Sequence, residues 1–111
     1  MLESLFGNKN IEKILFFLLA NKKCYPYQLQ KRFDVPLYGM QKALDRLEKS
    51  QLLVSFLYGK TRMYEFNPMY PFLKEFKFFL QKAYDSLPNK IKNVYYEPVI
   101  RTRPRKRTKP L

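Results

Sequence analysis

Apolar residues recur at helical spacing near the start of the chain. The spacing i, i+3, i+4, i+7 predicts a helix that starts after Asn8 or Asn10, either of which can cap it, and ends at about Asn21. The apolar stripe consists of Ile11, Ile14, Leu15 and Leu18. Three further apolar side chains lie off this stripe, at Phe16, Phe17 and Leu19. They indicate a second surface to bury, against another helix of the chain or against a second subunit.

Two more helices are predicted in the next part of the chain. Pro26 fits the first turn of a helix that ends at about Phe33. Pro36 then disfavours helical backbone at the preceding residue. A third helix is predicted over residues 37–50, and its inner face consists of Met40, Leu44 and Leu47. Two helices joined by a turn of about three residues have the spacing of a helix-turn-helix unit.

The pattern changes to a period of two over residues 52–66. Two alternating runs flank Gly59 and Lys60, and a glycine can supply the positive φ of a tight hairpin turn. A last helix is predicted over residues 71–87, and its apolar stripe consists of Phe72, Leu73, Phe76, Phe79, Leu80, Ala83, Tyr84 and Leu87. The β-prone segment 94–100 is expected either to add an edge strand or to dock on the core.

The order of these elements predicts a fold class. Helix, helix-turn-helix, hairpin and helix together indicate an α+β, mainly helical domain, a winged helix-turn-helix with a C-terminal helix, over residues 1–87. Residues 88–111 are expected to form a basic, mobile C-terminal tail, because they combine charge with proline and end in "RTRPRKRTKPL".

Charge then narrows the class of partner. The chain carries 22 Lys and Arg against 9 Asp and Glu, a formal net charge of +13. Residues 1–87 hold 14 basic and 8 acidic side chains, and residues 88–111 hold 8 and 1, so both parts are basic. This balance favours a polyanionic partner such as DNA, RNA or an anionic membrane surface. Phosphate contacts are expected in the tail from Arg101, Arg103, Arg105, Lys106 and Arg107.

Other chemistries find little support in the composition. The chain has no histidine and one cysteine, Cys24, which excludes intrachain disulfides, ordinary zinc sites and Cys/His catalysis. Carboxylate clusters and a Gly-rich phosphate loop are also missing from the sequence, so we expect no enzyme, no metal and no cofactor. Lys22 and Lys23 beside Cys24 could lower its thiol pKa, but a plain structural role is the favoured interpretation. The apolar run 14–20 is too short to span a bilayer, and we expect a cytoplasmic protein.

The outward side of the third helix is the predicted reading surface. The strip opposite the inner face, with its flanks, consists of Tyr38, Gln41, Lys42, Asp45, Arg46 and Lys49. Gln can pair with adenine, Lys with guanine, and Tyr with a phosphate or a thymine methyl. Asp45 is expected to pair with Lys42 or Lys49 rather than to face DNA. The alternative is an ordinary solvated helix face.

Two other segments are candidates for phosphate contacts. Lys60 and Arg62 lie in the hairpin, where they are expected to contact the DNA backbone without reading sequence. Tyr25, Tyr27 and Gln28 begin the second helix, whose N-terminus is a natural phosphate seat. A core role for either tyrosine is equally compatible with the pattern.

The last helix is the predicted dimer surface. Its stripe offers more apolar positions than a core of this size needs, and the expected interface residues are Phe72, Phe76, Phe79, Leu80, Ala83 and Leu87. The alternative is that the helix only closes its own core.

Residues 1–87 resemble the ArsR-like winged-helix superfamily. They look most like the winged-helix domains found in front of bacterial and archaeal nucleotidyltransferase modules. The resemblance is carried by "LFGNKNIEKILFFLL", "YPYQLQKRFDVP", "MQKALDRLEKSQLL" and "GKTRMYEFNPMYPFLKE". It implies a DNA-binding regulator that is often dimeric through its terminal helices. This chain departs from metal-sensing members, which bear cysteine pairs and histidines, and it has Gln51 where the family usually has glycine.

The leading hypothesis is a small transcriptional regulator, a repressor, that binds double-stranded DNA as a homodimer. One alternative is a module that holds a protein partner, such as a separately encoded toxin or nucleotidyltransferase. Another is RNA binding through the basic tail.

Overall fold

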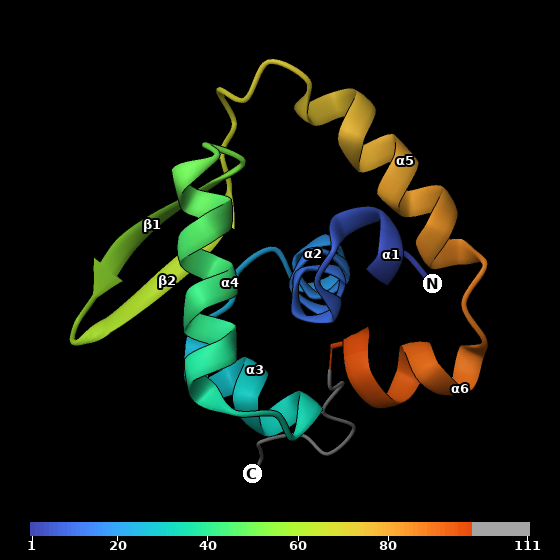
Figure 1. Cartoon of the computed structure of the whole chain (residues 1–111), viewed down its shortest axis with the longest axis horizontal. Helices are drawn as coiled ribbons and strands as arrows, with labels where there is room; N and C mark the ends of the chain where they lie inside the picture. The colour runs from blue at the N-terminus through green and yellow to red at the C-terminus, as the bar shows by residue number, and fades with distance from the viewer. Residues whose placement is uncertain (99–111) are drawn as a thin grey trace, which may run out of the picture.

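Helix α2 (Lys9–Asn21) is the centre of the computed structural model, which describes residues 1–98 (Figure 1). Seen end-on in Figure 1, α2 has α4 (Leu37–Lys49) on one side and α5 (Leu73–Asp85) on the other. Helix α3 (Pro26–Phe33) packs against α4, and the short α1 (Glu3–Phe6) lies against α2. The expected contacts at Arg101, Arg103, Arg105, Lys106 and Arg107 lie outside the described residues.

Helix α2 begins at a side-chain cap and is buried on most of its circumference. Asn8 is the capping residue, because its side-chain oxygen accepts a hydrogen bond from the amide of Asn10 at 2.7 Å. Phe16 and Phe17, which lie off the predicted stripe, are fully buried. Phe16 contacts the rings of Tyr84 and Tyr96 at centroid distances of 5.8 and 5.6 Å. At Phe16 and Phe17 the second surface of this helix is therefore covered by the same chain, whereas Leu19 is only partly buried.

The two predicted helices that follow are confirmed. Pro26 is the first residue of α3, and that helix ends where Asp34 adopts a left-handed conformation with φ of 53°. Pro36, in extended conformation, directly precedes α4. The inner face of α4 is buried at Met40, Ala43, Leu44 and Leu47. The opposite face of α4 is consequently presented to solvent.

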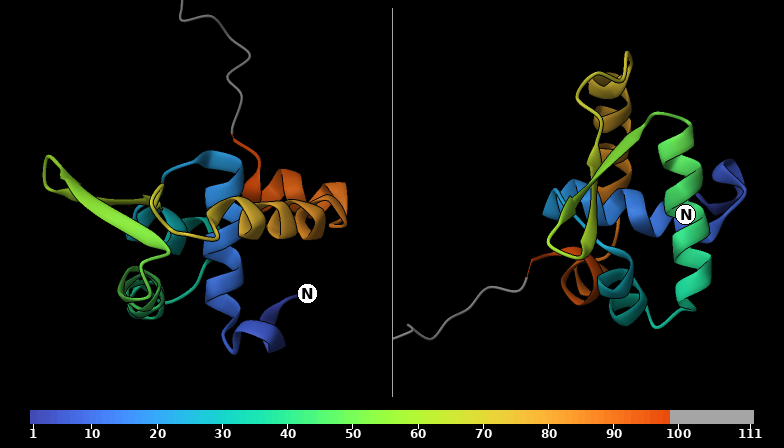
Figure 2. Two further views of the ribbon diagram at one scale, coloured as in Figure 1. Left: turned by 90° about the horizontal axis from the view of Figure 1, so that it is seen from above. Right: turned by 90° about the vertical axis from the view of Figure 1, so that its left-hand side faces the viewer.

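The predicted hairpin is also confirmed. Strands β1 (Leu53–Tyr58) and β2 (Thr61–Phe66) pair antiparallel with Tyr58 opposite Thr61, and Gly59 in the turn has φ of 65°. Figure 2 shows the hairpin extending away from the helices. At its base, the amide of Cys24 donates to the carbonyl of Tyr64 at 3.0 Å, and the amide of Tyr64 donates back at 2.8 Å. The hairpin is thus tied to the segment between α2 and α3.

The chain continues as packed structure beyond Leu87, whereas the sequence analysis placed residues 88–111 in a tail. Helix α6 (Asn89–Ile91) leads into a π-helix, η1 (Lys92–Tyr96), that packs against α2 (Figure 1). Tyr96 is buried, and its carbonyl accepts a hydrogen bond from the Asn21 side chain at 2.6 Å. Of the two expectations for this segment, docking on the core is confirmed for residues 94–96, which form a helix and no strand.

The observed elements confirm an α+β, mainly helical protein with one two-stranded antiparallel sheet in the described part of the chain. Their order and arrangement are compatible with a winged helix. None of the helices in residues 1–98 combines the length and apolarity needed to cross a bilayer.

Candidate nucleic-acid interface

The solvent-facing side of α4 forms the first part of the candidate interface. Tyr38, near the start of the helix, is 70% exposed, and Gln41, Lys42 and Lys49 are also exposed. The ammonium of Lys42 lies 5.4 Å from the centroid of the Tyr38 ring, which is the geometry of a cation–π pair. The ring of Tyr38 and the ammonium of Lys42, one helical turn apart, are therefore exposed side by side, and the side chain of Gln41 is exposed on the same side of α4.

Asp45 on this face is paired as the sequence analysis expected. Of its two possible partners, Lys49 is the one it contacts, with 3.0 Å between the ammonium and a carboxylate oxygen four residues apart. Both side chains are well exposed, so the pair contributes little to stability. The pair instead lowers the local positive charge, because the carboxylate of Asp45 partly neutralises the ammonium of Lys49. Lys42 forms no ion pair within residues 1–98 and is the stronger candidate for a phosphate or guanine contact.

Arg46 lies at the edge of this face. Its side chain is exposed, but it lines a small hollow between α4, α1 and α5 together with Phe6, Leu15 and Phe76. By helical spacing it lies on the opposite flank of the strip from Gln41. Arg46 therefore lies beside the strip in the last turns of α4, whereas Tyr38, Gln41 and Lys42 occupy the first turns of that helix.

The hairpin supplies the second part of the candidate interface and is joined to α4 by side chains. Arg62 donates a hydrogen bond from Nη1 to Ser55 Oγ at 2.9 Å, and Ser55 Oγ donates to Glu48 Oε2 at 2.5 Å. Sequence reasoning missed this chain of contacts, because it depends on how β1 leaves the end of α4. It links Arg62 to the helix through Ser55, and both Arg62 and Lys60 at the turn are exposed.

The start of α3 is less open than the sequence analysis allowed. The side-chain oxygen of Gln28 accepts a hydrogen bond from the amide of Tyr25 at 3.3 Å, so Gln28 is engaged in capping its own helix. Tyr25 is partly buried, and Tyr27 is exposed. Of these three residues, Tyr27 is the one free to contact a partner.

Cys24 is a buried structural residue. It is 0% exposed, and burial raises the pKa of its thiol to about 12. The proposed lowering of this pKa by Lys22 and Lys23 is wrong, because the ammonium of Lys23 instead lies 5.5 Å from the centroid of the Phe56 ring. The thiol is protonated at neutral pH, which confirms the favoured interpretation.

Only part of the predicted dimer surface on α5 is exposed to solvent. Leu80 is 0% exposed and belongs to the core, so its assignment to an interface is wrong: its side chain lies on the side of α5 that packs against α2. Phe72 and Phe79 are exposed, whereas Phe76, Ala83 and Leu87 are partly buried against the core. The ring of Phe76 lies 6.4 Å from those of Phe79 and Phe6.

The rings of Phe6, Phe76 and Phe79 adjoin one another, and Phe72, which precedes α5, and Ala83 lie on the same side by helical spacing. We use the name α5 apolar face for Phe6, Phe72, Phe76, Phe79 and Ala83. Met1 adjoins it, with 3.6 Å between its sulfur and the hydroxyl of Ser86. Helix α1 adds to this surface, because the ring of Phe6 lies against that of Phe76.

Comparison with known proteins does not assign the chain to a family. No protein-family model matches it, and no curated protein does.

Proposed function

We propose that this chain is a winged helix-turn-helix protein that binds duplex DNA sequence-specifically, and that it acts as a small transcriptional regulator, a repressor, in the form of a homodimer. The observation that carries the proposal is the joint presentation of α4 and the hairpin. Tyr38, Gln41 and Lys42 face solvent on α4, and the Glu48–Ser55–Arg62 contacts hold the basic hairpin beside them.

The dimensions of α4 suit the major groove. Its 13 residues span about 20 Å, and the groove of B-DNA is wide enough to admit an α-helix. The N-terminal part of a reading helix reaches base edges, and Tyr38, Gln41 and Lys42 lie in the first two turns of α4. Lys60 and Arg62 then contact the phosphates beside the groove, which fixes orientation without reading sequence.

The α5 apolar face is the proposed dimer interface. Exposed phenylalanines on a helix that already closes its own core indicate a surface that a partner covers. A second copy pairs the same patch with itself about a twofold axis. The two α4 helices then meet successive major grooves about 34 Å apart, so we expect a palindromic site.

The basic residues beyond the described part add affinity rather than specificity. The described chain ends close to α3, where Arg32 donates a hydrogen bond to the carbonyl of Tyr95 at 3.1 Å. Arg101, Arg103, Arg105, Lys106 and Arg107 follow within a few residues. Their charges increase binding to any duplex and make that binding strongly dependent on salt.

The experiment that tests the proposal is a binding selection from random duplexes at near-physiological salt. We expect an enriched palindromic motif, and we expect Gln41→Ala and Lys42→Ala to weaken its binding more than they weaken binding to unrelated duplexes. Lys90→Ala is the matched control, because Lys90 is an exposed lysine on α6, away from α4. A selection that enriches no motif would refute sequence-specific binding.

A protein-interaction module is the second candidate. It is favoured by the exposure of Phe72 and Phe79, since an apolar surface of this kind also suits an unrelated protein. Light scattering separates the two functions: a homodimer at micromolar concentration supports the regulator. A monomer without duplex preference supports the interaction module.

A further inference from the structure

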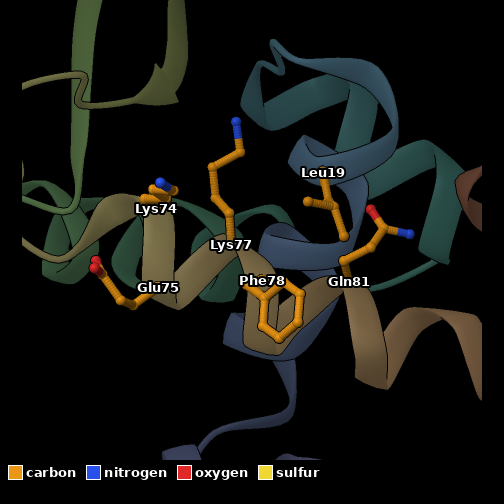
Figure 3. A pocket seen from close by; sticks show the side chains of 6 residues that line it. All are labelled: Leu19, Lys74, Glu75, Lys77, Phe78 and Gln81. Atoms are coloured by element: carbon orange, nitrogen blue, oxygen red, sulfur yellow. The ribbon is translucent and has the colours of Figure 1, made fainter.

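A hollow of about 450 Å³ lies between the end of α2 and the flank of α5 opposite the α5 apolar face. Its volume falls in the range of small-molecule sites, roughly 300–1,000 Å³. It is lined by Leu19, Lys74, Glu75, Lys77, Phe78 and Gln81 (Figure 3). The candidate nucleic-acid interface contributes none of these residues.

The apolar part of the hollow comes from both helices. Leu19 of α2 faces Phe78 and Gln81 of α5 in Figure 3. Phe78 is 66% exposed, and the ammonium of Lys82 lies 5.8 Å from the centroid of its ring. Sequence reasoning missed Phe78 because it lies off the periodic stripe of α5. A ligand that fills the hollow removes this ring from water, which favours binding.

The polar part of the hollow is cationic. Lys74 and Lys77 stand three residues apart on one side of α5, and neither forms an ion pair with a carboxylate of residues 1–98. Glu75 also lines the hollow, but its carboxylate is turned away from Leu19 (Figure 3). The hollow therefore combines an apolar wall with two lysines that form no ion pair within residues 1–98.

The hollow continues toward the sheet. Leu19 and Lys77 also line an adjoining depression with Lys22 and with Glu65 and Phe66 of β2. The ammonium of Lys77 lies 5.5 Å from the centroid of the Phe66 ring. An occupant can thus be longer than the first hollow, with its apolar portion along Phe78 and Leu19 and its charge beside Lys77.

We propose that this hollow is a binding site for a small amphipathic carboxylate, such as a medium-chain fatty acid. The apolar tail lies against Leu19 and Phe78, and the carboxylate accepts hydrogen bonds from Lys74 and Lys77. A neutral molecule of the same length leaves the two ammonium groups unpaired, and a cationic one is repelled by them.

Binding of such a ligand also changes the affinity for DNA, and this coupling rests on the proposed function. The hollow is framed by α2 on one side and by α5 on the other, and α5 carries the proposed dimer interface on its opposite flank. A ligand that fixes α5 relative to α2 changes the geometry in which two copies present their α4 helices. By linkage, DNA changes the affinity for the carboxylate by the same factor.

Binding is tested without DNA, so that its failure is distinguishable from failure of the proposed function. The probe is decanoate below its micellar concentration, titrated by calorimetry and mapped by amide chemical shifts in the full chain. We expect a Kd between roughly 10 µM and 1 mM for a ligand of this size. We expect shifts at Leu19, Lys77 and Phe78, and no comparable binding of 1-decanol.

Substitutions in the hollow, each with a matched control elsewhere, test whether the ligand binds there. Phe78→Ala and Lys77→Gln are each expected to raise the Kd about tenfold. Tyr58→Ala is the control for the ring, because Tyr58 is an aromatic residue of β1 that is 75% exposed and does not line the hollow. Lys90→Gln is the control for charge. Three results would each overturn the proposal: decanol binds as tightly as decanoate, binding is lost in Tyr58→Ala but not in Phe78→Ala, or decanoate does not bind up to 10-fold above roughly 1 mM.

Discussion

Tyr96 is the residue whose truncation tests the docking of η1 on the core. Its side chain is 5% exposed, and its ring centroid lies 5.6, 5.5 and 5.8 Å from those of Phe16, Phe33 and Tyr84. Burial of an aromatic side chain removes about 150 Å² from water, which at about 25 cal/mol per Å² corresponds to roughly 3–4 kcal/mol. We therefore expect Tyr96→Ala to lower the free energy of unfolding by about 3 kcal/mol.

Tyr95→Ala is the internal comparison. Tyr95 is 38% exposed, stacks on the ring of Phe33 with 5.6 Å between the centroids, and meets the ring of Tyr96 edge-on at 6.4 Å. One pair of this kind contributes about 1 kcal/mol, so the two neighbouring tyrosines should differ clearly. The backbone hydrogen bonds of both residues, to Asn21 and Arg32, remain possible in both variants.

Urea denaturation followed by far-ultraviolet circular dichroism measures the difference. A domain of this size has a total stability of about 5–15 kcal/mol, so a loss of 3 kcal/mol shifts the midpoint strongly. A loss below about 1 kcal/mol for Tyr96→Ala refutes the reasoning. In that case residues 88–97 contribute little to the fold, and a domain that ends at Leu87 is the better description.

Three further outcomes are expected. Gln51→Gly should raise the free energy of unfolding by about 0.5–1 kcal/mol in the same urea assay, because Gln51 has φ of 71°, whereas Ser50→Gly at φ of −76° should lower it. In urea denaturation at a series of pH values, the free energy of unfolding should fall as the pH rises above about 9–10. The first part of this fall should be smaller in Cys24→Ala than in the unchanged protein. The reason is that burial raises the folded-state pKa of Cys24, Tyr64, Tyr84 and Tyr96 above the unfolded value, so the unfolded state loses these protons first. A chain cut after residue 100 loses six basic side chains and should bind duplex DNA with a salt slope shallower by up to about 5, measured by anisotropy titration, with unchanged sequence preference.

Several features of the fold could be predicted because they follow from local chemistry. Asn8 caps α2 through its own side chain, Pro26 and Pro36 set the starts of α3 and α4, and Gly59 permits the hairpin turn. Each depends on residues within a few positions along the chain. The burial of Met40, Leu44 and Leu47 likewise follows from a single period.

Features that depend on how elements meet could not be predicted. The apolar stripe of α5 does not reveal that Leu80 faces α2 while Phe79 faces solvent, because that division depends on where α2 lies. The link from Glu48 through Ser55 to Arg62 requires the angle between α4 and β1. The segment of η1 is β-prone in sequence, and its helical form reflects the aromatic surroundings of Tyr96 more than local preference.

The hairpin is fastened at two separate places, and this bears on the entropy of any association. On β2, Tyr64 exchanges backbone hydrogen bonds with Cys24, and on β1 its cross-strand partner Ser55 links Arg62 to Glu48 of α4. A partner that contacts both α4 and the hairpin meets two elements whose relative motion was already restricted on folding. Little ordering remains to oppose binding, so such a partner associates with a pre-organised surface. Substitutions at its contacts should then act mainly on the dissociation rate.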